Sequence, residues 1–180
     1  MRKLTHAQIV ARQETLQQAP RMPLTVVLDD IRSLHNVGSV FRTADGAGVE
    51  KLYLCGITGS PPQSEIHKTA LGAEERLPWE YQRDAAAVVM NLKRAGYRIV
   101  LLEQTDASGD YIRYVPDGPL ALIVGNEITG VADALVALAD TAIEIPMAGI
   151  KNSLNVSVAF GIVVYHLRQF FVRASSSFPA

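Results

Sequence analysis

The chain has 180 residues, enough for one domain whose core needs no disulfide or metal, and its 48% of hydrophobic residues is ordinary for a globular protein. The formal net charge of −1 excludes binding to nucleic acid through overall positive charge, so any RNA contact must come from local basic clusters. Cys55 is the only cysteine, which excludes an internal disulfide and a cysteine metal cluster.

The beginning of the chain is polar. Met1 and Arg2 lead into a segment without an apolar signal, and no run in the sequence reaches about 18 apolar residues. We therefore expect a cytoplasmic protein that does not enter a membrane. Residues 5–18 predict a peripheral helix, because Ile9, Val10 and Leu16 are its few apolar contacts.

Predicted strands and helices alternate in the following part. The continuous apolar run LTVVL, residues 24–28, predicts a strand covered on both faces. A helix is expected over residues 37–47, ended by Gly48 as its C-cap. Residues 51–55 (KLYLC) predict a second strand, and residues 56–78 predict a long irregular segment, which in a compact domain is usually functional or mobile.

The alternation continues to the last strand. A helix capped by Asp84 is expected to run to Arg94, and buried strands are expected at residues 98–102 and 120–124. A short helix over residues 131–138 and a strand ending near residues 142–145 complete the pattern. Strands that alternate with helices predict an α/β fold, a single-domain parallel sheet with helices on both faces.

The C-terminal part combines a constrained loop with an apolar helix. Pro146 ends the preceding strand, and Ser153 is predicted to cap a helix that continues to Phe171. This helix is apolar around most of its circumference, so more than one side of it must be covered. We expect a ligand loop beside a subunit interface, with a C-terminal core helix as the simpler alternative.

Three stretches that follow predicted strands carry candidate chemistry, since ligand sites of α/β folds gather there. In the first, Asn36 at the predicted N-cap and Arg42 two turns later are expected at one pocket mouth. In the second, Gly125 and Gly130 bracket the carboxylate of Glu127, which lets backbone approach a ligand closely. The third is the loop of residues 145–155.

Several familiar sites are absent from the sequence. There is no G-x-G-x-x-G fingerprint after the first strand, no P-loop and no G-x-S-x-G nucleophile motif. The four histidines have no metal-ligand spacing, so no metal is expected. His166 on the last helix is interpreted as a packing residue, whereas His35 and His67 in loops stay candidates for substrate contact.

Taken together and in this order, the three stretches resemble the motifs of the SpoU family of RNA ribose 2′-O-methyltransferases, within the SPOUT class. NVGSVFRTADGAG resembles the first motif, LIVGNEITGV the second and IPMAGIKNSLNVSVA the third. The resemblance runs from about Leu24 to Tyr165, and the intervening KTALGAEERLPW also fits the family pattern.

The resemblance implies more than the residue pattern alone. It implies a SPOUT methyltransferase domain over residues 24–172 with a C-terminal deep trefoil knot. The residue pattern itself predicts an N-terminal helical extension (1–23) before this domain and a disordered tail (173–180) after it. The resemblance implies that S-adenosylmethionine binds in the knot, largely through backbone groups. The family's cofactor positions correspond to Leu102, Gly125, Ile145, Met147 and Leu154, and its catalytic polar positions to Asn36, Arg42, Glu127, Ser153 and Asn155.

The resemblance also implies partners, namely tRNA or rRNA and a second copy of the chain that packs against the last helix. The residue pattern itself predicts a basic rim beside the three motifs that contacts RNA phosphates, with dispersed solvated charges as the alternative; the rim comprises Arg32, His35, Arg42, Lys68, Arg76 and Lys151. Two alternatives remain open: a knotted or flavodoxin-like protein that binds a nucleotide without catalysis, and a small-molecule α/β enzyme using Arg42 and Glu127 on an anionic substrate.

Overall fold

A seven-stranded parallel sheet forms the centre of the computed structural model, which describes residues 1–17 and 20–174. The spatial order of the strands is β3-β2-β1-β6-β4-β7-β5, and every paired neighbour is parallel. The strands are β1 (Met22–Asp29), β2 (Val49–Cys55), β3 (Trp79–Gln82), β4 (Arg98–Leu102), β5 (Gly109–Asp110), β6 (Leu120–Val124) and β7 (Thr141–Glu144). The predicted α/β fold with a parallel sheet is confirmed.

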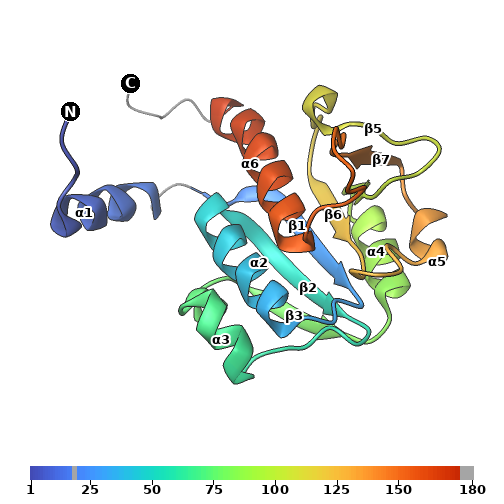
Figure 1. Ribbon diagram of the computed structural model, residues 1–180, viewed down its shortest axis with the longest axis horizontal. Helices are drawn as coiled ribbons and strands as arrows, with labels where there is room; N and C mark the ends of the chain where they lie inside the picture. Colours follow the sequence, from blue (N-terminus) through green and yellow to red (C-terminus); the bar gives the residue numbers. More distant parts are fainter. Residues whose placement is uncertain (18–19, 175–180) are drawn as a thin grey trace.

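Helices cover both faces of the sheet (Figure 1). On one face, α2 (Leu34–Ala47), α3 (Ser64–Ala70) and α6 (Val156–Ala174) contribute to the larger of two apolar clusters. On the other face, α4 (Ala85–Arg94) and α5 (Asp133–Val136) contribute to the smaller one. Successive side chains of a strand point to opposite faces of the sheet. The central strands are apolar at successive positions, so they contribute to a core on each face.

The central strands agree closely with the sequence patterns. All five residues of β6 (LALIV) are buried, because the strand has paired neighbours on both edges and helices on both faces. The bounds expected for β4 and β6 are those observed. α1 (His6–Gln17) has no buried residue and extends away from the sheet, as Figure 1 shows. Among the described residues, no helix is long and apolar enough to span a membrane.

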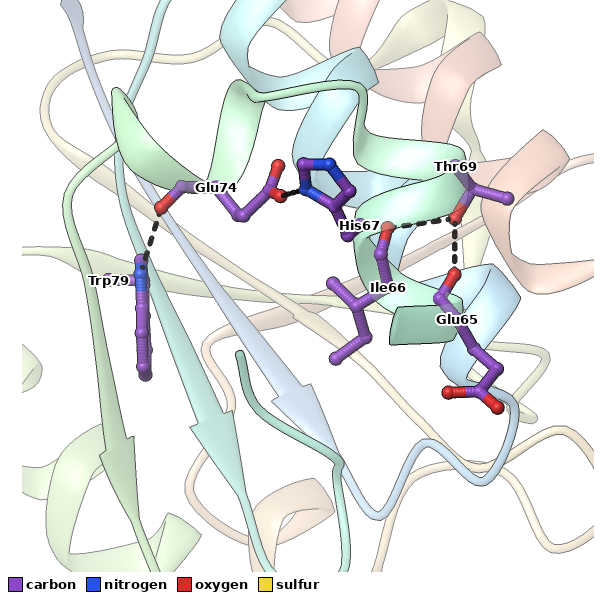
Figure 2. Close-up of polar contacts among 6 residues, drawn as sticks. All are labelled: Glu65, Ile66, His67, Thr69, Glu74 and Trp79. Carbon is purple, nitrogen blue, oxygen red and sulfur yellow. Dashed lines mark hydrogen bonds and ion pairs between the residues drawn. The ribbon is translucent and has the colours of Figure 1, made fainter. Parts of the chain in front are cut away.

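The prediction of an irregular segment over residues 56–78 is wrong. It contains α3 and a 3-10 turn (Ala73–Glu75), and the edge strand β3 follows it. Figure 2 shows the contact that joins these elements: His67 Nδ1 lies 2.5 Å from Glu74 Oε1, and Trp79 Nε1 donates to the Glu74 carbonyl oxygen at 3.1 Å. These contacts link separate turns, so they leave no periodic signal in the sequence.

Close packing of α3 on α2 depends on a glycine. A Cβ at Gly38 would lie 2.1 Å from Thr69 Oγ1 and 2.3 Å from the Ile66 carbonyl oxygen, so only glycine lets the two helices approach this closely. The Thr69 hydroxyl also donates to the His35 carbonyl oxygen at 3.1 Å. The position of α3 is thus a tertiary effect that its short sequence does not encode.

Two helix starts differ from the predictions. α2 begins at Leu34, and its N-cap is Ser33, whose hydroxyl accepts from the Asn36 N–H at 3.3 Å. Asn36 is therefore inside the first turn and is not the cap, which frees its side-chain amide for other contacts. α6 begins at Val156. Here the Asn155 side chain accepts from the Ser157 N–H at 2.9 Å, so Asn155 takes the capping role predicted for Ser153.

Only one side of α6 is covered within a single chain. Phe160, Val163, Val164 and Leu167 are buried against the sheet and α2. A second row on the helix, spaced three or four residues apart, is exposed; it consists of Val158, Ile162 and Tyr165. His166 packs edge-on against Tyr111 and Phe170, which agrees with its expected packing role.

The C-terminal bounds also need a correction. The predicted tail begins at residue 173, but α6 continues to Ala174. The rest of the predicted tail, residues 175–180, lies outside the described residues. α5 is a single turn at Asp133–Val136, shorter than the helix expected over residues 131–138.

Candidate active site

A cavity of about 470 Å³ lies where β4, β6 and β7 end. Its walls come from the loops that follow these three strands and from the start of α6. The five residues expected to hold a cofactor all line it: Leu102, Gly125, Ile145, Met147 and Leu154. Sheet order explains the gathering, because β4 pairs with both β6 and β7 and the loops therefore leave the sheet side by side.

Gly125 is required by the tight loop that forms one wall. A Cβ at this buried position would lie 2.3 Å from the Val131 nitrogen, closer than real Cβ contacts allow. The loop closes through two backbone hydrogen bonds between Asn126 and Gly130, of 3.1 and 3.0 Å. The Asn126 amide also donates to the Asp30 carbonyl oxygen at 2.7 Å, which anchors the loop to the end of β1.

Glu127 extends from this loop and accepts three hydrogen bonds. Its Oε2 accepts from the Arg32 N–H at 2.9 Å, and its Oε1 accepts from the Ser33 N–H at 3.0 Å and from Asn36 Nδ2 at 2.9 Å. Burial works to raise the pKa of Glu127, but the hydrogen bonds from Arg32 and Asn36 prevail and lower this pKa below its ordinary value. The carboxylate is thus held ionised and in a fixed orientation.

The network continues from Asn36 to the third motif. Asn155 Nδ2 donates to Asn36 Oδ1 at 3.1 Å, while Asn155 Oδ1 accepts from Ser157 N and Oγ. Glu127, Asn36 and Asn155 therefore form one polar chain, which joins the first, second and third motifs. Glu127, Ser153 and Asn155 also line the cavity, and Asn36 contacts it through Glu127.

Arg42 is not brought to the cavity within one chain. It is exposed on α2, about two turns beyond Asn36, and it is not among the cavity-lining residues. Within residues 1–17 and 20–174, no hydrogen bond or ion pair holds its guanidinium. The expectation that Asn36 and Arg42 share one pocket mouth is therefore wrong for a single chain.

The residues predicted to contact RNA do not form one rim. Arg32 is exposed beside Glu127, and Lys151 is exposed in the loop that borders the cavity. His35 and Lys68 lie together near the start of α2 and the end of α3. Arg76 lies near the amino end of β2, away from the cavity at the carboxyl ends of the strands. Arg21 donates to the carbonyl oxygens of both Arg76 and Val49, and Val49 is the first residue of β2.

Five cavity-lining polar residues were missed by the sequence analysis: Glu103, Gln104, Asn126, Glu144 and Asn152. Glu103 and Gln104 come directly after the buried strand RIVLL, at the carboxyl edge where ligands of parallel sheets bind. That rule could have identified them.

The sequence matches known proteins along most of its length. The model of the SpoU rRNA Methylase family matches residues 23–165. A putative TrmH family tRNA/rRNA methyltransferase of Staphylococcus haemolyticus is 33% identical over 142 residues, which cover 79% of this chain and 57% of that protein. The tRNA (guanosine(18)-2′-O)-methyltransferase of Thermus thermophilus is 32% identical, with 94% of this chain and 86% of that protein covered.

Solved structures extend the comparison. The TrmH/SpoU tRNA modifying enzyme of A. aeolicus superposes with a TM-score of 0.81 at 28% identity, covering 93% of this chain and 86% of that one. The methyltransferase AviRb of Streptomyces viridochromogenes, in complex with the cofactor AdoMet, has a TM-score of 0.77 at 26% identity, with coverage of 89% and 65%. The chain spans little more than half the length of some relatives, such as the staphylococcal protein.

Proposed function

The chain belongs to the SpoU rRNA Methylase family, and on this premise we propose that it transfers the methyl group of S-adenosylmethionine to a ribose 2′-hydroxyl of tRNA or rRNA. The observation that carries the proposal is the cavity at the ends of β4, β6 and β7, bordered by the polar chain Glu127–Asn36–Asn155. Relatives named for tRNA and for 23S rRNA match similarly well, so the proposal covers both RNA classes.

The cavity fits S-adenosylmethionine in size and chemistry. Its volume of about 470 Å³ is in the range of small-molecule sites. Leu102, Ile145 and Leu154 offer apolar walls for the adenine, and the Gly125 backbone has no side chain that would hold a ligand away. Carboxylates of Glu103, Glu127 and Glu144 at the walls suit the positive charge of the cofactor.

The bound cofactor would supply a methyl group already activated on a sulfonium, so the protein needs no acid to help the leaving group. The chain's own task is to position the ribose and to stabilise the negative charge that develops on its 2′-oxygen. We assign this task to Arg42, whose guanidinium would bind the adjacent phosphate and the developing alkoxide. A guanidinium stays positively charged in proteins, so Arg42 acts as an electrostatic group and not as the base, and the proton of the 2′-hydroxyl leaves to the phosphate or to water.

The position of Arg42 supports assembly of the site from two copies. The exposed row of α6, formed by Val158, Ile162 and Tyr165, is a side of the helix that the sequence predicted to be covered. α6 packs beside α2, the helix that carries Arg42; for example, Arg168 on α6 donates to the Ala47 carbonyl oxygen. A second copy of the chain docked on α6 would therefore lie close to α2. We propose that Arg42 of one chain acts at the cavity of this second copy.

We also propose a knot in the C-terminal part of the chain. Family membership and the TM-score of 0.81 support a SPOUT domain over residues 24–172 whose C-terminal part is tied in a deep trefoil knot. The loops after β4, β6 and β7, which line the cavity, would then be the loops of the knot. The knot would hold these loops together without a disulfide.

We propose RNA contacts at Arg32, His35, Lys68 and Lys151, which are exposed on the cavity edge or on the neighbouring α2–α3 surface. Arg76 is not part of this surface, because its backbone lies near the amino end of β2, away from the cavity. If these side chains bind phosphates, RNA affinity should fall steeply as salt rises. Affinity that is unchanged between 50 and about 200 mM salt would contradict the proposed surface.

Two measurements test the function. The first is binding of S-adenosylhomocysteine by calorimetry, with NAD and FMN as controls that should not bind. The second is transfer of a labelled methyl group to total tRNA or rRNA, followed by mass spectrometry of 2′-O-methylated nucleosides. Binding without transfer to either RNA class would support the alternative of a nucleotide-binding protein, and binding of neither cofactor nor product would contradict the proposal.

A further inference from the structure

The segment directly after β4 fastens the other loops around the cavity. Glu103 Oε2 accepts from the Val131 N–H at 3.0 Å, which attaches the loop after β6. Gln104 Nε2 donates to the Asn152 carbonyl oxygen at 2.7 Å, which attaches the loop after β7. Neither Glu103 nor Gln104 lies in the three stretches that carry the family resemblance, so both are new candidates for a role at the site.

Glu103 gives this segment a fixed position. Its Oε1 accepts from the Gln104 N–H at 2.9 Å, and its backbone N–H donates to the Ile143 carbonyl oxygen at 3.1 Å. Gly130 leaves room for the carboxylate, because a Cβ there would lie 2.4 Å from Glu103 Oε2. Gln104 therefore extends from a well-anchored base.

The loop of residues 146–154, by contrast, has little polar attachment. Within the described residues, the bond from Gln104 is the only hydrogen bond made to any residue of this loop. Ile150 and Lys151 at its tip are exposed, whereas Met147, Ser153 and Leu154 face the cavity. One neutral hydrogen bond from Gln104 thus ties a nine-residue wall of the cavity to the rest of the site.

We propose that Gln104 is a positioning residue that holds loop 146–154 against the cavity and thereby sets cofactor affinity and the rate of cofactor exchange. The inference rests on the proposed function, since it assumes that the cavity binds S-adenosylmethionine. A ligand enclosed by this loop must leave past it, so loosening the loop should speed release more than binding. A single neutral hydrogen bond changes such equilibria by roughly threefold to tenfold.

The test compares Gln104→Met, which keeps the length of the side chain but removes its donor, with Gln104→Lys, which keeps a donor of similar reach. Gln13→Met on α1 is the matched control, because Gln13 is exposed and far from the cavity in sequence. The ligand for binding is S-adenosylhomocysteine, which has no net charge, so that the lysine does not repel it. The readouts are Kd by calorimetry, release rate by chase, KM for S-adenosylmethionine against kcat, and Tm without ligand.

We expect Gln104→Met to raise the Kd and the release rate by roughly threefold to tenfold, with the Tm of the free protein within about one degree. KM for S-adenosylmethionine should rise more than kcat changes, and Gln104→Lys should recover most of the affinity. An unchanged Kd and release rate in Gln104→Met, or an equal change in Gln13→Met, would overturn the inference. A fall in Tm that accounts for the loss of binding would also overturn it, whereas failure of the unmodified protein to bind would instead contradict the proposed function.

Discussion

Asn36 and Asn155 are 119 residues apart in the sequence, yet Asn155 Nδ2 donates to Asn36 Oδ1 at 3.1 Å. The other side of the Asn36 amide donates to Glu127, so one side chain serves two loops at once. An amide is the group that can do this, because it carries a donor and an acceptor on the same plane. Asn36 is therefore the point at which the three motifs of the site meet.

We expect Asn36→Asp to abolish most of the methyl transfer. The carboxylate would lose the donor to Glu127 and place a second negative charge beside it, which raises the pKa of Glu127 and pushes its loop away. Loss of a hydrogen bond to a charged group corresponds to roughly tenfold to 100-fold in activity. The measurement is the initial rate of labelled methyl transfer, and Asn91→Asp on α4 is the matched control. Equal rates for the two variants would contradict the role of Asn36.

Arg42→Ala should remove turnover but leave cofactor binding within about twofold, because we assign Arg42 to the phosphate and 2′-oxygen of the RNA and not to the cofactor. Loss of one group that stabilises developing charge lowers kcat by about 100-fold to 1,000-fold. Arg42→Lys keeps the charge but loses the planar fork, so we expect it to retain only a trace of activity. Single-turnover rates and calorimetry separate the two effects, with exposed Arg83→Ala as the control. A rate for Arg42→Ala close to that of the unmodified protein would refute the assignment.

Val158→Glu and Ile162→Glu should split the proposed dimer. Both side chains are exposed on α6, at 50% and 36% of their full areas, so a charge there leaves the core intact but must be buried when a partner docks. Sedimentation velocity at micromolar concentration should show a dimer that becomes a monomer. Val136→Glu on α5 is the matched control, because Val136 is 38% exposed on a different face. A stable monomer of the unmodified protein would remove the basis of this prediction.

His67→Ala should destabilise the protein near neutral pH and less so in acid. The Glu74 side chain is only 7% exposed, and burial works to raise its pKa, but its own backbone hydrogen bond and His67 lower that pKa below 4.5. A lowered pKa stabilises the native state above the ordinary value, and this contribution is lost as the pH falls through the folded value.

The cost of His67→Ala should be about 1 to 2 kcal/mol at pH 6, the cost of a hydrogen bond lost by a buried carboxylate. Below about pH 4 the difference from the unmodified protein should shrink, since Glu74 becomes protonated. Urea unfolding between pH 3 and pH 6 measures both values, with His35→Ala as the control. A difference that is constant across this range would mean that the pair with Glu74 is not its source.

Local sequence patterns were sufficient to predict the buried strands and the ends of several helices. The buried strands β4 and β6 were predictable because continuous apolar runs have few other uses in a chain of this composition. The C-cap at Gly48 has φ of 78°, a conformation that its residue type already indicates. Candidate cofactor residues such as Gly125 and Leu154 were found because they lie at the ends of these elements or within a recognisable motif.

Contacts between distant segments were decided only by the tertiary structure. The order β1-β6-β4-β7 brings together loops that are far apart in the chain, and so determines that Asn36 meets Glu127 and Gln104 meets Asn152. The same order leaves Arg42 outside the cavity of its own chain. Periodicity and local propensity describe which residues face a core, but they contain no information about which strands become neighbours. That pairing depends on the packing of the whole sheet, and it is what turns three separate motifs into one site.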